Sequence, residues 1–136
     1  MKFKGFTVLE SSCEWNMVDP KDMSNISMIQ DSYPIDLSLN VNYDPNQNAT
    51  FIFLTLNINN EKKPGYSIHV NCCGIFSFDK DCMLSEEEQH ALLQNSGTSI
   101  CITNLRSYIA EITAYYPMGK YNFPLVDLQS LWSTSK

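Results

Sequence analysis

Apolar and polar side chains alternate without a break over residues 35–42. This period of two is typical of a β-strand with one face on a core and the other in water. Residues 49–59 repeat the pattern, with Ile and Leu on one face and mainly Phe, Thr and Asn on the other. Between the two segments, Asp44-Pro45-Asn46 favours a turn. The segments are therefore predicted to form an antiparallel hairpin.

Two longer segments extend this sheet. Residues 66–78 follow a break at residues 61–65 and are strand-like throughout, and Gly74 suggests a bulge within them. Residues 3–15 also alternate, but their apolar positions change phase near residues 10–12, where we expect a bulge or a bend. The pattern predicts four antiparallel strands before the first helix.

The chain then changes to a helical period. Ser85 and Glu88 match the capping box, which predicts a helix over residues 85–94, and Asn95-Ser-Gly97 is expected to end it. A last short helix is predicted near the C-terminus, with Val126 or Asp127 as its cap.

The main helix is predicted between these two, over residues 100–116, because Pro117 ends the helical pattern. Its apolar positions repeat every three or four residues, which is the spacing of one helix face. The stripe consists of Ile102, Leu105, Ile109 and Ile112, with Tyr108 and Tyr115 beside it.

These elements indicate an α+β fold: a four-stranded antiparallel β-meander followed by a main helix and short helices. A length of 136 residues suits one domain, residues 1–136. One connection, residues 16–34, is long for so small a domain, and such connections are usually functional or disordered. Its apolar content argues against disorder.

Charge and composition exclude several classes of protein. Nine basic and fifteen acidic side chains give a net charge of −6, which disfavours binding to nucleic acid. No apolar run approaches the ~20 residues of a membrane helix, and the N-terminal residues lack the apolar stretch of a signal peptide. Five cysteines at irregular spacings do not resemble a secreted disulfide framework. We expect a soluble, cytoplasmic protein without membrane insertion.

Motifs for catalysis or metal binding are missing. The sequence has no glycine-rich phosphate loop, no H-E-x-x-H and no G-x-S-x-G, so an enzyme is not expected. Cys73 near a histidine could act as a nucleophile, whereas a free cysteine most often packs as a small buried apolar side chain. Potential zinc ligands fit no usual spacing, and we expect neither a metal nor a cofactor. These ligands are His69, Cys72, Cys73, Cys82 and His90.

Apolar side chains are the remaining candidate for a functional surface. The chain has 7 Phe, 7 Tyr, 2 Trp and 6 Met, and several lie in the long connection and near the C-terminus, where a core does not obviously need them. Methionine suits surfaces that accept varied apolar partners. The alternative is that these side chains cover the sheet or a subunit interface. The residues concerned are Met23, Met28, Tyr33, Phe123, Leu128 and Trp132.

Four segments resemble the SecB family of export chaperones, and they occur in the family's order. Tyr33-Pro34 resembles the family's aromatic-plus-proline entry into the second strand, and Gly74-Ile75-Phe76 resembles its G-I-F motif. Arg106 stands where the family's main helix has an arginine, although Thr103-Asn104 replaces the usual Pro-Tyr. Residues 123–132 resemble the family's P-V-x-F-x-x-L-[FY] ending. The resemblance spans nearly the whole chain.

The resemblance implies a homotetramer, a dimer of dimers with the main helices between the sheets. It also implies ATP-independent holding of unfolded or precursor polypeptides in apolar grooves, which the long connection and the helices line. We expect the groove residues to be Met28, Ile29, Tyr33, Phe123, Leu128, Leu131 and Trp132. We expect the subunit interface to contain Ile102, Leu105, Tyr108, Ile109 and Ile112.

The family's export partner, the SecA translocation motor, is recognised by acidic side chains on the exposed sheet face. The matching positions here are Ser12, Asn16, Ser67 and His69, which do not offer the same negative field. The resemblance therefore leaves engagement of SecA open. The alternatives are a SecB-like chaperone or adaptor dedicated to one partner, for example an antitoxin, and an enzyme that uses a Cys/His pair.

Overall fold

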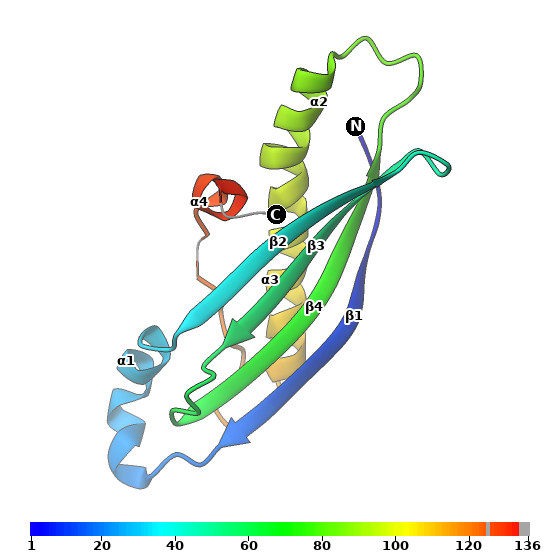
Figure 1. Cartoon of the computed structure of the whole chain (residues 1–136). Coiled ribbons are helices and arrows are strands. Elements are labelled where there is room, and N and C mark those ends of the chain that lie inside the picture. Colours follow the sequence, from blue (N-terminus) through cyan, green and yellow to red (C-terminus); the bar gives the residue numbers. More distant parts are fainter. Residues whose placement is uncertain (125, 134–136) are drawn as a thin grey trace.

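The computed structural model describes residues 1–124 and 126–133 of the chain. It contains one four-stranded antiparallel sheet in the order β1-β4-β3-β2 (Figure 1). Strands β2, β3 and β4 follow one another as a meander, and β1 lies beside β4 at the edge, which is a Greek-key arrangement. The predicted α+β fold with four antiparallel strands is confirmed. The predicted four-stranded meander is corrected in one respect: β1 pairs with β4 and not with β2, because the long connection after β1 carries the chain to the other edge of the sheet. The strands are β1 (Lys2–Asn16), β2 (Ile35–Asp44), β3 (Ala49–Ile58) and β4 (Gly65–Ser77).

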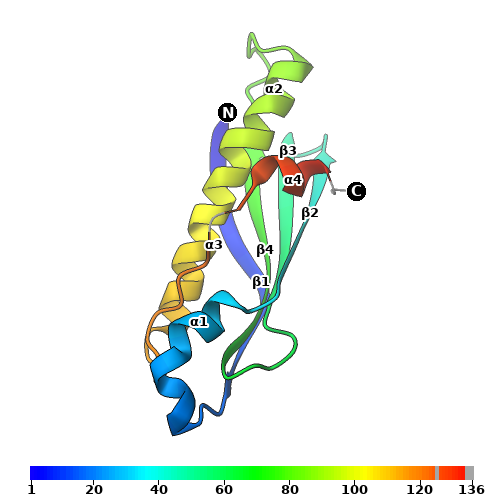
Figure 2. The ribbon, with the colours of Figure 1, turned by 90° about the vertical axis from the view of Figure 1, so that its left-hand side faces the viewer.

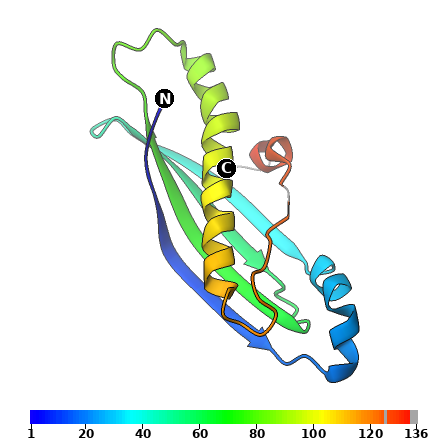
Figure 3. The same cartoon turned by 180° about the vertical axis from the view of Figure 1, so that it is seen from behind.

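Helices cover one face of this sheet (Figures 1 and 3). Helix α2 (Glu86–Leu92) begins with the predicted capping box at Ser85, and α3 (Thr98–Thr113) is the main helix. The predicted break between them is wrong, because a π-helical turn, η2 (Leu93–Gly97), joins them into one rod. Gly97 lies against Ile52 of the sheet, and the close packing of helix on sheet outweighs the conformational cost of glycine.

The core lies between the sheet and α3. Alternate side chains of β3 and β4 point into it, as the period of two predicts, and they meet the inner face of α3. The opposite, outer face of the sheet carries half-buried side chains such as Phe51 and Phe53, whose rings stack 6.1 Å apart. Core residues from the sheet are Ile52, Leu54, Leu56, Ile58, Tyr66, Ile68, Val70, Cys72 and Phe76, and those from α3 are Cys101, Ile102, Leu105 and Ile109.

The predicted bulge at Gly74 is wrong, because β4 pairs with β3 in unbroken register there. The irregularities lie in β1, between Phe3 and Gly5 and between Val8 and Glu10, the second of them slightly before the predicted phase change. Gly74 serves a different purpose: a Cβ at this position would overlap the Sγ of Cys101 on α3. The glycine is needed for close approach of helix and sheet.

The long connection between β1 and β2 is mostly helical. It forms a 3₁₀ helix, η1 (Pro20–Asn25), and a short helix, α1 (Ile26–Asp31), at the end of the sheet where β3 turns into β4 (Figure 2). The backbone N–H of Asn59 in that turn donates to the carbonyl of Pro34 at 2.9 Å. The connection is therefore attached to the sheet.

After α3 the chain runs back along the helix to α4 (Leu128–Ser133) (Figure 3). The carboxylate of Asp127 accepts hydrogen bonds from the backbone N–H groups of Gln129 at 3.1 Å and Ser130 at 3.4 Å. Of the two predicted caps, Asp127 is the one observed.

Candidate functional site

A cleft opens between α1 and the chain segment that follows α3. Its volume is about 270 Å³. We call residues 119–124, which form one wall, the strap. The cleft is lined by Ser27, Gln30, Asp31, Ile35, Lys120, Tyr121, Asn122 and Pro124.

Tyr33 anchors the α1 side of the cleft. Its side chain is only 5% exposed, and its hydroxyl donates to the carbonyl of Pro64 at 2.6 Å and accepts from the N–H of Tyr66 at 3.1 Å. Burial raises the pKa of the Tyr33 phenol. Its ring lies 6.0 Å from that of Tyr121 on the strap. Tyr33 therefore joins the long connection, the β3–β4 turn and the strap.

Two hydroxyl groups hold the beginning of the strap. Thr113 Oγ1 accepts from the N–H of Tyr121 at 2.8 Å and donates to the carbonyl of Ile109 at 2.7 Å. The hydroxyl of Tyr66 donates to the carbonyl of Gly119. Burial raises the pKa of both Tyr66 and Tyr121 to about 12, so both phenols stay neutral at physiological pH.

Arg106 of α3 holds the end of the strap. Its Nε donates to the carbonyl of Phe123 at 3.0 Å and its Nη2 to the carbonyl of Pro124 at 3.2 Å. The guanidinium also lies 5.9 Å from the centre of the Phe123 ring, within range of a cation–π contact. Side chains alternate along the strap: Tyr121 and Phe123 are buried, whereas Asn122 and Pro124 are exposed.

Helix α4 docks further along the same side of α3. The indole Nε1 of Trp132 donates to Thr98 Oγ1 at 2.7 Å, and the Trp132 ring meets the ring of His90 edge-on at 5.3 Å. Leu131 is buried. Thr98 in turn donates to the carbonyl of Leu93 at 3.1 Å. Leu131 and Trp132 thus pack on their own chain.

The predicted groove residues fall into two groups, one near α1 and one on α4 (Figure 2). Met28 is 72% exposed on α1, and Ile29, Leu128 and Trp132 are half-buried. Tyr33, Phe123 and Leu131 are almost fully buried. Among the predicted groove residues, Met28 is therefore the most exposed, whereas Tyr33, Phe123 and Leu131 offer almost no free surface.

The residues predicted for the subunit interface differ in burial and fall into two groups. Ile102, Leu105 and Ile109 face the sheet of their own chain and are buried there. Tyr108 and Ile112 are half-buried, and the Tyr108 hydroxyl hydrogen-bonds to that of Ser11 on β1.

Two further apolar side chains are exposed. Leu9 of β1 is 54% exposed and was not predicted, whereas Tyr115, which was predicted beside the stripe, lies just after α3 and is 99% exposed. Leu9 lies at the irregularity between Val8 and Glu10, where strand alternation gives no direction for a side chain. The sequence does hold a signal for Leu9: it is an apolar residue next to the point where the alternation of residues 3–15 changes phase.

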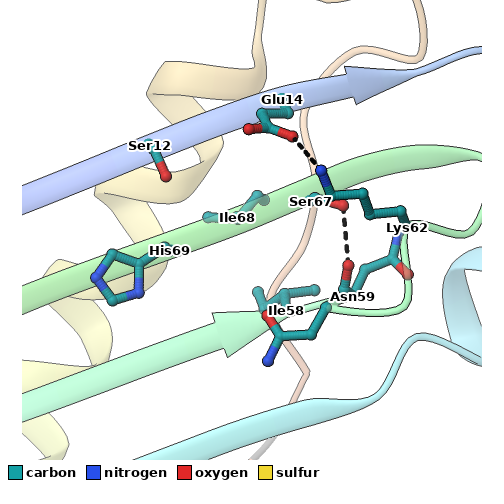
Figure 4. Close-up of a pocket in the computed structure, with 9 residues that line it drawn as sticks. Ser12, Glu14, Ile58, Asn59, Lys62, Ser67, Ile68 and His69 are labelled. Atoms are coloured by element: carbon teal, nitrogen blue, oxygen red, sulfur yellow. Dashed lines mark hydrogen bonds and ion pairs between the residues drawn. The ribbon is translucent and has the colours of Figure 1, made fainter.

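The outer sheet face carries a small polar pocket of about 140 Å³, shown in Figure 4. It contains Ser12, Ser67 and His69, three of the positions matched to the acidic site of the SecB family. The fourth, Asn16, donates from its side chain to Ser67 Oγ at 2.8 Å. Asn16 and Ser67 are therefore engaged in hydrogen bonds within this face.

Sequence reasoning overlooked two carboxylates on this face. Glu14 pairs with Lys62 at 3.4 Å, and Glu10 lies 3.3 Å from His69 Nε2. His69 Nδ1 is 2.7 Å from the side-chain oxygen of Asn57. The face is thus acidic in part, but each carboxylate has a basic neighbour.

Three of the five cysteines, including the candidate nucleophile, are buried. Burial raises the pKa of Cys72 and Cys101 to about 12, so these thiols stay protonated. Burial also raises the pKa of Cys73, the candidate nucleophile, and makes its thiolate scarcer. Within residues 1–124 and 126–133, no three His, Cys, Asp or Glu side chains are placed to hold a metal ion. Among the helices described, none has the length and apolar character needed to cross a bilayer.

Comparison with known proteins adds a structural neighbour. No protein-family model matches the sequence, and no match was found among curated protein sequences. A SecB-like chaperone from Mycobacterium tuberculosis, solved in complex with a peptide from an antitoxin, superposes with a TM-score of 0.65 at 14% sequence identity. The match covers 93% of this chain and 90% of that one. This chain has a SecB-like fold.

A second solved structure, a protein of unknown function from Streptococcus agalactiae, matches less well. Its TM-score is 0.43 at 9% identity, over 91% of this chain and 96% of that one. Only the first neighbour bears on the resemblance noted in the sequence, and it supports that resemblance at the level of the fold.

Proposed function

We propose that this protein is an ATP-independent chaperone that holds unfolded or precursor polypeptides in an apolar groove. The groove runs along the β2 side of α3, from α1 past the strap to α4. The observation that carries the proposal is the position of Met28: it is 72% exposed on a helix that borders the cleft, on a SecB-like fold.

The energetics suit holding without a nucleotide. An unfolded chain exposes apolar side chains, and burial of apolar surface contributes about 25 cal/mol per Å² without demanding one sequence. A flexible thioether such as that of Met28 adapts to side chains of different shape. Contact residues would be Met28, Ile29, Leu128 and Trp132, with Tyr33, Phe123 and Leu131 beneath them.

A dedicated partner is the second candidate. The structural neighbour from Mycobacterium tuberculosis was solved with an antitoxin peptide, so a dedicated client of this kind is the specific alternative to test. General export through SecA is less well supported, because the carboxylates of Glu10 and Glu14 on the outer sheet face lie beside His69 and Lys62. A cytoplasmic location stays a prediction.

We further propose that the chain assembles as a homotetramer through the β1 side of α3. Tyr108 and Ile112 keep part of their surface free there, and Leu9 and Tyr115 add exposed apolar surface. An apolar face of this kind is stabilised when a second copy covers it. Ile102, Leu105 and Ile109 would act indirectly, by fixing the helix on its own sheet.

Suppression of aggregation tests the chaperone function. Reduced insulin, whose B chain aggregates, is mixed with the protein without ATP, and light scattering is followed. We expect wild type to suppress scattering and Met28→Ser to require about three- to tenfold more protein, from the lost apolar contact. Met83→Ser is the matched control, since Met83 is 97% exposed and lies outside the groove. A wild-type protein without any effect on scattering or on client binding would overturn the proposal.

A further inference from the structure

We propose that Arg106 is a positioning residue for client binding: its guanidinium holds the strap on α3 and so shapes the cleft at the α1 end of the proposed groove. The inference rests on the proposed function. In this role Arg106 acts through the strap and does not itself contact the client.

The strap depends on side chains for its position. It forms neither helix nor strand, so its backbone polar groups find no partners in a regular ladder. The N–H of Tyr121 is bonded to Thr113 Oγ1, and the carbonyls of Phe123 and Pro124 are bonded to Arg106. Arg106 therefore provides both hydrogen bonds that fix the far end of the strap to α3.

The guanidinium is suited to this role for a geometric reason. Two N–H groups of one rigid, planar fork reach two consecutive carbonyls, and its face lies over the Phe123 ring. A lysine ammonium is a point charge without such a fork and cannot fix both carbonyls in the same orientation. Arginine thus fixes the direction of the strap as well as its distance from α3.

The alternation of side chains transfers this constraint to the cleft. With Phe123 held inward, Asn122 and Pro124 project outward and form the wall opposite Gln30 and Asp31 of α1. If the end of the strap moves, this wall moves with it, and the cleft loses its preformed shape. A polypeptide would then bind at the cost of ordering the strap, and its affinity would fall.

The test compares Arg106→Gln and Arg106→Lys with wild type. The probe is fluorescein-labelled, reduced and carboxymethylated α-lactalbumin, a permanently unfolded chain, and its dissociation constant and dissociation rate are measured where all variants are fully folded. We expect about tenfold weaker binding for Arg106→Gln, from the loss of charge-assisted hydrogen bonds, and an intermediate value for Arg106→Lys. Lys80→Gln removes the same charge from the exposed loop after β4 and should bind like wild type.

Hydrogen exchange separates positioning from general destabilisation. We expect faster exchange at Tyr121 and Phe123 in Arg106→Gln, with unchanged exchange in β3 and β4. If exchange in the strap rises while the probe binds as to wild type, the positioning role is overturned. Equal weakening in Arg106→Gln and Lys80→Gln also overturns it, since charge alone would then explain the effect. If wild type does not bind the probe or suppress aggregation, the proposed function itself fails, and this inference fails with it.

Discussion

The hydroxyl of Tyr33 occupies the space in which a side chain on Gly65 would begin. Gly65 has a φ of +107°, a left-handed conformation, and a Cβ built on it would overlap Tyr33 Oη. The hydroxyl bonds to the residues on either side of this glycine, Pro64 and Tyr66. One glycine therefore allows the long connection to be attached to the β3–β4 turn.

We expect Gly65→Ala to destabilise the protein by more than the roughly 1–3 kcal/mol of backbone strain alone. The methyl group would displace Tyr33 and break its two hydrogen bonds. Urea unfolding followed by circular dichroism measures the free energy of unfolding. Gly119→Ala is the control, because Gly119 also has a positive φ, +71°, but no atom lies near its Cβ position. Equal losses in the two variants would contradict the role of Tyr33.

A second glycine can be tested together with its neighbour. Gly74→Ala places a methyl group on Cys101 Sγ, which should force α3 away from β4 and cost about 1–3 kcal/mol. The double variant Gly74→Ala/Cys101→Ala makes room for the methyl group. We expect it to be more stable than the sum of the single changes predicts, by at least about 0.5 kcal/mol of coupling. Strict additivity in urea unfolding would show that the two residues do not compete for space.

These two glycines illustrate how far sequence reasoning reached. Alternation over residues 49–59 predicted a strand with two different faces, and the Ile and Leu face proves to be the fully buried one. The sequence analysis singled out Gly74, but a glycine is needed there because Cys101, which is distant in sequence, packs against it. The π-helical turn was missed because Asn95-Ser-Gly97 has the composition of a loop. Packing of Gly97 on Ile52 stabilises the helical conformation there.

The candidate site was predicted only in part. The long connection and the C-terminal segment were identified by their apolar residues, and both border the cleft or the α4 docking site. Their attachment could not be predicted, because Arg106 and Thr113 bind backbone groups of the strap, and a backbone group leaves no trace in the sequence. Exposure was equally hidden: Met28 and Tyr33 are near in sequence, yet one is free and the other buried.

Thr98 offers a test of how α4 is attached. Its buried hydroxyl accepts from Trp132 Nε1 and donates to the carbonyl of Leu93 in the π-helical turn. Thr98→Val keeps the shape and removes both bonds, so we expect a loss of about 1–3 kcal/mol in the free energy of unfolding. Thr103→Val, at an exposed site on α3, should change it by less than about 0.5 kcal/mol. A Thr98→Val protein as stable as wild type would show that this contact is dispensable.

Assembly is tested on the β1 side of α3. Native mass spectrometry of wild type should give four times the chain mass of 15.5 kDa. Ile112→Asp puts a charge into the proposed contact and should reduce the mass to that of a dimer or a monomer, with unchanged circular dichroism. Ile75→Asp is the matched control, because Ile75 is also half-buried but lies on the outer sheet face. If only Ile75→Asp dissociates the oligomer, the assembly uses the opposite face.

Alkaline pH should destabilise the fold through its buried thiols and phenols. Burial raises the pKa of Cys72 and Cys101 from 9.0 to about 12, and that of Tyr66 and Tyr121 from 10.0 to about 12. At a pH between the ordinary pKa and the raised pKa of each group, the unfolded chain has released a proton that the folded chain keeps. The contribution of these four groups to the free energy of unfolding should therefore be fully present below about pH 8 and be lost as the pH rises through 9 towards 12.

Urea midpoints at pH 8, 9, 10 and 11, with a reducing agent present, measure this decline. Cys72→Ala removes one of the buried thiols, so its midpoint, although lower at pH 8, should fall less steeply than that of wild type. An identical slope in the two proteins would mean that Cys72 does not stay protonated in the folded state, and the burial of this thiol in the core would need another explanation.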